Sequence, residues 1–323
     1  MTARLPNADQ LFATLDATWP AALCRRCGPW LIRDGQGGGK RVSAATAAAD
    51  GAAGDIASAE AAMRALGQTP LFLLREGEQA LDAALAARGY RIVDPVVIYA
   101  APCTTVATPS PAPLTAFAHW PPLAIAVEIW AAAGIGPARL AVMDRVAGPK
   151  TAILGRIADR ASGAAFLAIH DSCAMLHALE VAPTLRRQGG ANNILRSAAC
   201  WAQDHGAATL SLVVTQANAG ARTLYASLGM EVVGQYHYRQ NQAPPEARAV
   251  ATRNSPPPAT PPAVRCPAAG AGGTCARRPG RDAHFPRTGH DHGQPQRATD
   301  QFSAADRPLQ RGGPADPADR RCL

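Results

Sequence analysis

The feature that most constrains the fold is a strand that passes through a glycine-containing turn directly into an amphipathic helix. The strand is predicted over residues 175–181 and the helix over about 190–204. The helix carries its apolar side chains on one face, at Ile194, Leu195, Ala198, Trp201 and Ala202. A strand followed by a helix that covers it is a building unit of layered α/β domains.

Further strand and helix patterns continue this arrangement on both sides. Residues 114–242 predict the order β-α-α-β-β-β-α-β-α-β, which indicates an α/β fold with a mixed sheet and helices on both faces. Residues 1–103 predict a helix and then β-β-α-β-α-β, with strands at 28–33 and 41–45. Between these halves, residues 104–113 contain three prolines and predict a linker.

Residues 243–323 differ in composition from the rest of the chain. They hold 14 of the 28 prolines, twelve arginines, seven acids and no Ile, Met, Trp or Tyr. We expect a disordered tail, because such a segment cannot bury enough apolar area to offset its ordering entropy. Three explanations stay open: a basic extension for nucleic acid or acidic partners, an inert linker, or GC-rich DNA translated out of frame. We favour the last.

The net charge of +8 says little about the folded part, because residues 1–242 carry 20 basic and 17 acidic side chains. We therefore do not expect nucleic acid as a partner. The N-terminal sequence lacks the apolar segment of a secretory signal, and no stretch predicts a membrane span. We expect a cytoplasmic protein that binds no metal, because Cys24 and Cys27 lack a second close pair of ligands.

The turn between the strand and the helix has the chemistry of an anion site. It reads Arg186-Arg187-Gln188-Gly189-Gly190-Ala191. The first N–H groups of a helix lack partners within it and carry partial positive charge, so they bind phosphate groups well. The segment lacks the Gly-Lys-Ser/Thr of a P-loop and the three spaced glycines of a dinucleotide fold. By itself it is compatible with a diphosphate site or with a plain glycine turn.

The order of motifs around this turn resembles the GNAT superfamily of N-acetyltransferases. Arg-x-x-Gly-x-Ala, which ends at Ala191 and precedes the amphipathic helix, resembles the acyl-CoA loop of that family. Asn218, Ala221 and Tyr225 match its second motif, with Met230 where members have an aromatic residue. The resemblance covers roughly residues 114–240.

The first half is similar to the degenerate copy found in tandem members of the same family. It lacks both motifs, so we expect it to bind no CoA and to wall off the acceptor cleft.

The resemblance implies roles for individual residues. Backbone groups of Leu179 and Val181 would pair with the pantetheine arm, and the Val181 N–H would polarise the thioester carbonyl. Asn218 and Ala221 would lie at the cofactor, whose diphosphate would bind Arg186, Arg187, Gln188, Gly189, Gly190 and Ala191. Tyr225 would protonate the departing thiolate as the general acid; its alternative role is that of a core aromatic residue.

The resemblance assigns no single residue as the general base. Glu180 is the nearest carboxylate to the expected thioester, and a base and a salt-bridge partner are equally good interpretations of it. Strand alternation places His177 on the opposite sheet face unless a bulge shifts the register. Tyr236, His237 and Tyr238 are candidates for lining the acceptor site.

The resemblance thus implies an enzyme, an N-acetyltransferase that transfers an acetyl group from acetyl-CoA to a primary amine by direct attack. The alternative is a non-catalytic acyl-CoA-binding regulator. The acceptor, the acyl chain preference and the oligomeric state stay open.

Overall fold

The structure, a computed structural model, describes residues 4–48 and 52–241. The predicted tail at 243–323 lies outside the described residues. In the part of the chain that is described, no helix is long and apolar enough to cross a membrane.

The first half contains the elements that precede residue 107. In chain order they are α1 (Ala8–Thr18), β1 (Leu23–Cys27), β2 (Trp30–Asp34), η1 (Lys40–Val42), β3 (Thr46–Ala47), η2 (Ala52–Gly54), α2 (Ile56–Ala65), β4 (Leu71–Arg75), α3 (Gln79–Ala87), β5 (Tyr90–Pro102) and α4 (Cys103–Val106). Helix α1 begins at a capping box, in which Asn7 and Gln10 each bond the other's backbone N–H at 2.9 Å.

The second half contains the remaining elements. They are β6 (Ala116–His119), α5 (Ala124–Ala132), α6 (Pro137–Arg145), β7 (Lys150–Ile157), β8 (Arg160–His170), β9 (Cys173–Val181), η3 (Pro183–Leu185), α7 (Gly190–Asp204), β10 (Thr209–Thr215), α8 (Ala219–Ser227) and β11 (Glu231–Asn241). This order matches the mixed strand and helix order that the sequence predicts for this half.

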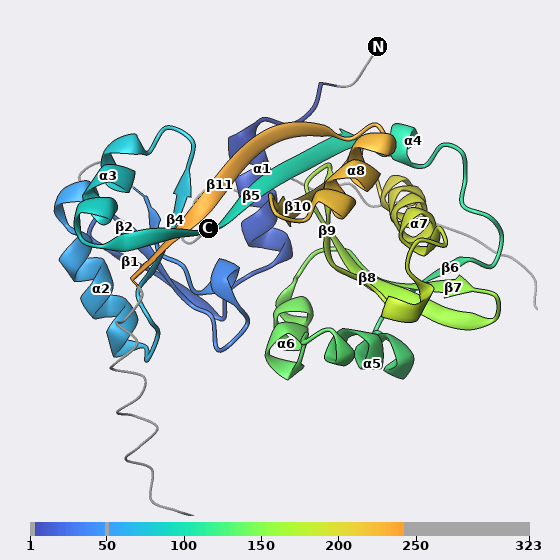
Figure 1. The fold of residues 1–323 in the computed structure, drawn as a ribbon, viewed down its shortest axis with the longest axis horizontal. Helices are drawn as coiled ribbons and strands as arrows, with labels where there is room; N and C mark the ends of the chain where they lie inside the picture. The colour runs from blue at the N-terminus through green and yellow to red at the C-terminus, as the bar shows by residue number, and fades with distance from the viewer. Residues whose placement is uncertain (1–3, 49–51, 242–323) are drawn as a thin grey trace, which may run out of the picture. The chain divides into compact units, whose positions relative to one another are not determined.

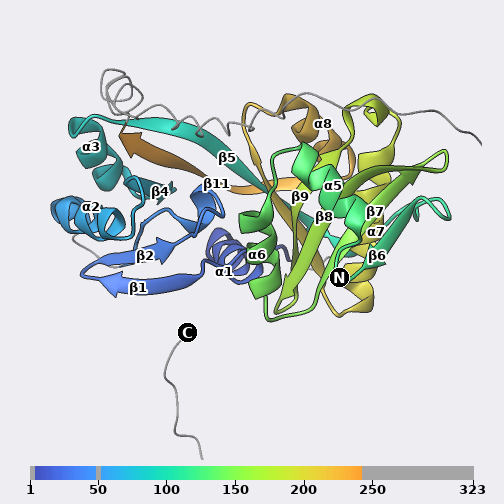
Figure 2. The ribbon, with the colours of Figure 1, turned by 90° about the horizontal axis from the view of Figure 1, so that it is seen from below.

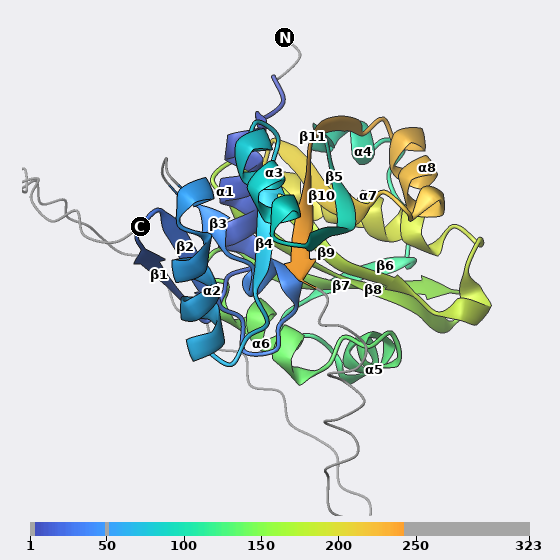
Figure 3. The same ribbon diagram turned by 60° about the vertical axis from the view of Figure 1, so that its left-hand side comes forward.

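One eight-stranded sheet runs through both halves, in the order β4-β11-β5-β10-β9-β8-β7-β6 (Figure 1). Strands β9 and β10 run parallel, and the other neighbouring pairs are antiparallel. Helices α7 and α8 lie on one side of the second-half strands and α5 and α6 on the other (Figure 3). The predicted mixed sheet with helices on both faces is therefore confirmed.

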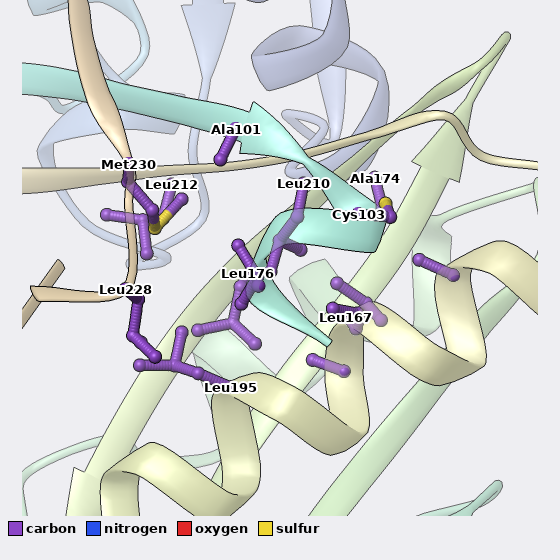
Figure 4. Packing of buried hydrophobic residues seen from close by; sticks show 14 of the residues in the cluster. Ala101, Cys103, Leu167, Ala174, Leu176, Leu195, Leu210, Leu212, Leu228 and Met230 are labelled. Atoms are coloured by element: carbon purple, nitrogen blue, oxygen red, sulfur yellow. The ribbon is translucent and has the colours of Figure 1, made fainter. Parts of the chain in front are cut away.

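The core beneath α7 is made of small and branched apolar side chains. Leu195 from the helix and Leu167, Leu176 and Leu210 from three strands are at most 3% exposed (Figure 4). Alanines at 198, 199 and 202 let α7 approach the sheet closely. This packing fixes where the helix begins, and with it the position of the glycine turn.

The second face of the sheet is covered partly by the first half. Trp19, which follows α1, and Val42 pack in one cluster with Val142 and Met143 of α6. Arg145 at the end of α6 also donates to the Pro20 carbonyl oxygen at 3.3 and 3.4 Å. Figure 2 shows α1 and α6 side by side at this junction.

The two halves contain a repeated unit. Adding 140 to the bounds of α3 gives the bounds of α8, and the same shift relates Gly89 to Gly229. The strand pairing follows the same rule: Phe72 pairs with Arg239, and Leu212 pairs with Tyr99. Strands β4 and β5 therefore correspond to β10 and β11 by a pseudo-twofold relation.

Each half supplies its last strand to the other half. Strand β5 of the first half pairs with β10, while β11 of the second half pairs with β4, and β5 and β11 pair with each other. Equivalent side chains reinforce the exchange: Asp82 of α3 binds Arg239 of β11, and Arg222 of α8 donates to the Tyr99 hydroxyl of β5 at 3.4 Å.

The first half differs from prediction in its small sheet, ordered β1-β2-β3. The strand predicted at 41–45 is wrong: residues 40–42 form the 3₁₀ turn η1, and the strand that pairs with β2 is Thr46–Ala47. Residues 35–45 separate β2 from β3, which is too long a loop for a tight hairpin. Glycines 37 and 39 in this loop have φ of 78° and 103°. Strand β1, which contains both cysteines of the Cys-x-x-Cys, was not predicted.

The Asp82 ion pair yields a prediction about acid stability. Arg239 donates to both Asp82 carboxylate oxygens at 2.7 Å and lowers its pKa to about 2, against the opposing effect of burial and with a further contribution from His237. Because the folded-state pKa lies below the unfolded value, this stabilisation is present above about pH 4 and is lost as the pH falls towards 2. Asp82→Asn should lower the free energy of unfolding by about 1–2 kcal/mol at pH 7, and much less near pH 2.

Urea unfolding at both pH values measures this difference. The control is Asp159→Asn, which removes an 86% exposed carboxylate paired with Arg156. A stability loss for Asp82→Asn that is equal at both pH values would contradict the assignment.

Candidate functional site

A bulge in β9 opens the sheet at the site. On β8, Phe166 pairs with His177 and Ala164 pairs with Glu180, so Ala178 and Leu179 together oppose Ala165. Ala178 has φ of 52°, in the left-handed region that non-glycine residues rarely adopt. The parallel pairing of β9 with β10 ends at Leu176 and Leu212, immediately before the bulge. Beyond that point the two strands diverge.

The free edge of β9 faces the gap. Ala182 N–H donates to the Ser162 carbonyl at 2.8 Å, which makes these two residues a hydrogen-bonded pair of the antiparallel ladder. Because such pairs alternate, the N–H and C=O of Val181 point away from β8, towards the β10 side. The Nε–H of Arg186 donates to the Val181 carbonyl oxygen at 3.1 Å. The Val181 N–H is therefore the backbone donor directed into the gap.

The glycine turn forms the N-terminus of α7. Gly189 is the N-cap residue and has φ of 83°, a conformation that costs glycine little. Gly190 is buried, and a Cβ there would lie 3.0 Å from Ile157 and 3.2 Å from the Ser162 hydroxyl. Arg186 and Arg187 are exposed beside this helix start. The turn thus combines free helix N–H groups with two cations, as an anion site requires.

Helix α8 forms the opposite side of the site. Asn218 is its N-cap residue, and the side-chain oxygen accepts from the Ala221 N–H at 3.1 Å. The Asn218 amide nitrogen therefore stays available as a donor. Tyr225 is 6% exposed and packs its ring on Tyr99 at a centroid distance of 5.7 Å. Burial, and then the charge of Glu180, raise the pKa of Tyr225 to about 12.

These elements enclose a cleft of about 780 Å³. Its lining includes eleven of the twelve residues that were given a role in catalysis or acyl-CoA binding: Leu179, Glu180, Val181, Arg186, Arg187, Gly189, Gly190, Ala191, Asn218, Ala221 and Tyr225. Gln188 does not line it, and its side chain donates to the Thr184 carbonyl at 3.4 Å. A cleft of this size is typical of a small-molecule or cofactor site.

Glu180 lines the cleft and is half-buried. Burial raises the pKa of its carboxyl group, and the positive charges of Arg186 and Arg139 partly offset this increase. A carboxylate with a raised pKa accepts a proton more readily at neutral pH than an exposed one.

The bulge also changes the predicted relation between Glu180 and His177. Paired residues of an antiparallel ladder share a face of the sheet. Phe166 and Ala164 are two residues apart on β8 and therefore lie on the same face. Their partners on β9, His177 and Glu180, lie on that face as well. Simple alternation would place them on opposite faces, and the exception allowed above, a bulge that shifts the register, is what the structure has. The extra residue at 178 is the reason.

His177 makes a fixed connection between the two halves. A guanidinium N–H of Arg41 donates to its Nδ1 at 3.0 Å, so Nε2 carries the proton and donates to the Thr18 hydroxyl at 2.8 Å. The Thr18 hydroxyl in turn donates to the Thr14 carbonyl at 2.6 Å. Burial, and then the charge of Arg41, lower the pKa of His177. This imidazole is held neutral and does not line the cleft.

The three candidates on β11 lie elsewhere. Tyr236 and Tyr238 are buried in the cluster that also contains Phe12 of α1. His237 contacts Asp82 at 2.7 Å and lines a separate hollow of about 410 Å³ over α3 and β11. The larger cleft, rather than this hollow, contains the residues expected to bind acyl-CoA and to act in catalysis.

Sequence reasoning missed the support beneath the site. The indole N–H of Trp130 in α5 donates to the carbonyl oxygen of Ala178 at 2.8 Å, across 48 residues of sequence. Neither residue belongs to a recognisable motif, and only the tertiary structure brings them together. Across residues 4–48 and 52–241, no group of three His, Cys, Asp or Glu side chains has the arrangement of a metal site.

Comparisons with known proteins agree with this geometry. The sequence model of the Acetyltransferase (GNAT) family matches residues 136–230. The "Uncharacterized N-acetyltransferase YobR" of Bacillus subtilis (strain 168) is 26% identical over 232 residues, which cover 69% of this chain and 94% of that protein.

Solved structures share the fold. A GCN5-related N-acetyltransferase from Kribbella flavida superposes with a TM-score of 0.59 at 20% identity, covering 76% of this chain and 99% of the other. A conserved protein of unknown function from Staphylococcus epidermidis ATCC 12228 gives a TM-score of 0.55 at 11% identity, covering 71% and 97%.

The matched segment contains the bulged strand β9, the glycine turn, α7 and α8, which together line the cleft. Residues 136–230 of this chain therefore match the Acetyltransferase (GNAT) family, and the cleft lies within that segment.

Proposed function

We propose that the protein is an N-acetyltransferase that transfers an acetyl group from acetyl-CoA to a primary amine by direct attack. The observation that carries the proposal is the single cleft in which a strand gap, a helix N-terminus, Glu180 and Tyr225 meet. A cofactor with a diphosphate and an amide-containing arm needs an anion site next to a free strand edge, and this cleft has both.

Binding of the co-substrate is assigned to the backbone and to α7. The diphosphate binds the N–H groups of the Gly189–Ala191 segment, with Arg186 and Arg187 as counter-charges. The amide-containing arm pairs with the free edge at Leu179 and Val181, and Asn218 donates to it. Acetyl-CoA supplies a thioester whose acyl group is activated towards attack.

The transfer step is assigned to three groups. Glu180 accepts a proton from the acceptor ammonium group, so that the neutral amine nitrogen can attack the thioester carbon. The Val181 N–H donates to the carbonyl oxygen as it gains negative charge. Tyr225 stays protonated at neutral pH, and its hydroxyl donates a proton to the sulfur as the carbon–sulfur bond breaks. The second proton that the attacking nitrogen loses restores the Tyr225 hydroxyl, and Glu180 releases the first proton to water. The products are the N-acetylated amine and free CoA.

The proposed activity is tested by incubating the protein with acetyl-CoA and a panel of primary amines, including amino acids and peptide amines. Release of free CoA that depends on an amine is the expected result. A protein that binds acetyl-CoA tightly and releases no CoA with any amine would instead be a non-catalytic acyl-CoA-binding regulator.

Tyr225→Phe tests the general acid. It keeps the buried ring and removes the hydroxyl, so kcat should fall by about 100-fold while the Kd for CoA changes little. Steady-state kinetics and calorimetric titration give the two values. Tyr99→Phe is the matched control, because that ring packs on Tyr225 and its hydroxyl contacts Arg222. Equal losses of kcat in both variants would count against the assigned role.

Gly189→Ala tests the anion site. Gly189 and Gly206 have φ of 83° and 85°, and a Cβ at either position meets no atom within 4 Å. Alanine should therefore cost a similar stability at both sites, about 1 kcal/mol. Only Gly189→Ala should weaken CoA binding, because its Cβ enters the space of the diphosphate. Unchanged CoA affinity, measured by titration, would rule out this location.

Glu180→Gln tests the general base. Because burial raises the pKa of Glu180, wild-type kcat/KM should fall as the pH decreases through that pKa and the carboxylate becomes protonated. The glutamine variant should be slower and should lack this acid limb. Glu128→Gln, on the exposed side of α5, is the control. An identical pH profile in wild type and Glu180→Gln would show that another group accepts the proton.

A further inference from the structure

Trp130 occupies an unusual position beneath the cleft. It lies in α5 and is 0% exposed, and its indole N–H donates to the Ala178 carbonyl oxygen at 2.8 Å. Ala178 is the bulged residue of β9, so α5 reaches the one point where the strand departs from regular pairing.

The bulge needs a partner of this kind. An extra residue in a ladder leaves a backbone group without its regular partner, and an unsatisfied buried carbonyl costs free energy. The φ of 52° at Ala178 adds backbone strain, because alanine has a Cβ. The indole N–H satisfies the carbonyl in the strained conformation, and this contact favours the bulge over a regular strand.

The position of the bulge determines the geometry of the cleft wall. After Ala178, the strand is held on the β8 side, where Ala182 N–H donates to the Ser162 carbonyl. Gly163 allows an especially close approach there, since a Cβ would lie 2.5 Å from the Glu180 carbonyl oxygen. On the β10 side the pairing has already ended. Trp130 therefore fixes the starting point of the segment that presents Glu180 and the Val181 N–H.

We propose that Trp130 is a positioning residue: its indole N–H holds the Ala178 bulge and thereby keeps the β9–β10 gap open for the acyl donor. The identity of that donor as acetyl-CoA rests on the proposed function. The hydrogen bond and the strained backbone are independent of it.

Trp130→Phe removes the N–H and keeps an aromatic ring in the core. The matched control is Trp30→Phe. Trp30 is also 0% exposed, and its indole N–H donates to a backbone carbonyl, that of Asp55, at 2.9 Å in the first half. Both variants lose one buried indole–carbonyl hydrogen bond, so both should lose similar thermal stability.

Binding of CoA by the full-length chain, measured by titration calorimetry, separates the two variants. We expect Trp130→Phe to raise the Kd about tenfold, the factor that corresponds to one hydrogen bond's worth of free energy, and Trp30→Phe to leave it within about twofold. Equal effects of the two variants on the Kd for CoA would mean that Trp130 only stabilises the fold, and would overturn the proposal.

A glycine at the bulge provides a second test. Glycine adopts a positive φ without strain, so Ala178→Gly should make the bulge less dependent on the indole. In that background, Trp130→Phe should raise the Kd for CoA by only about threefold, less than the tenfold expected with alanine. A loss of the same size in both backgrounds would mean that Trp130 acts by another route.

Backbone amide exchange distinguishes a failure of this proposal from a failure of the proposed function. In the ligand-free protein, the Ala182 amide, which donates to the Ser162 carbonyl just after the bulge, should exchange faster in Trp130→Phe than in Trp30→Phe. Exchange that is equal in the two variants would contradict the positioning role. A wild-type protein that binds no CoA, with the exchange difference present, would contradict only the proposed function.

Discussion

The parallel pairing of β9 with β10 lasts for four residue pairs and then stops, and the site depends on this interruption. A sheet that stayed paired would satisfy every backbone group and leave no edge for a ligand. Here the extra residue at Ala178 turns the strand, and the N–H of Val181 faces the gap. The helix N-terminus at Gly189 and the side chain of Tyr225 then border the same space. One local defect in the sheet thus creates a free strand edge beside the cleft.

The first half of the chain completes the sheet that carries this site. Strand β5 pairs with β10 on the edge opposite β9, so β10 is held in place where its contact with β9 ends. In the same way, strand β11 of the second half pairs with β4 of the first half. This exchange of strands makes the two halves one structural unit. The hydrogen bonds of the neutral His177 imidazole with Thr18 and Arg41 add a polar connection between the halves. Stability and site geometry are therefore coupled across the two halves.

The charged side chains that matter for the cleft are those that lie next to it. Of the net charge of +8, residues 1–242 carry only +3. At the cleft, Arg186 and Arg187 lie beside the free N–H groups of α7, and Glu180 is a half-buried acid of the same lining. Burial raises the pKa of the Glu180 carboxyl group, and the charges of Arg186 and Arg139 partly offset this increase. The cleft thus combines cations that suit an anionic ligand with a carboxylate that can accept a proton.

The sequence by itself determined the local elements and most of the cleft lining. Its turn residues, N-caps and apolar periodicities act over a few positions, so the order of elements in the second half was predictable. The glycine turn, together with the resemblance to a known family, pointed to eleven residues that line the cleft. Only the tertiary structure decided that β5 and β11 exchange partners, because a strand's alternation is the same whichever neighbour it has. It also decided that His177 and Glu180 share a face, since nothing in the sequence marks Ala178 as a bulge. The bulge is stabilised by Trp130, 48 residues away, and such a contact exists only once the chain has folded.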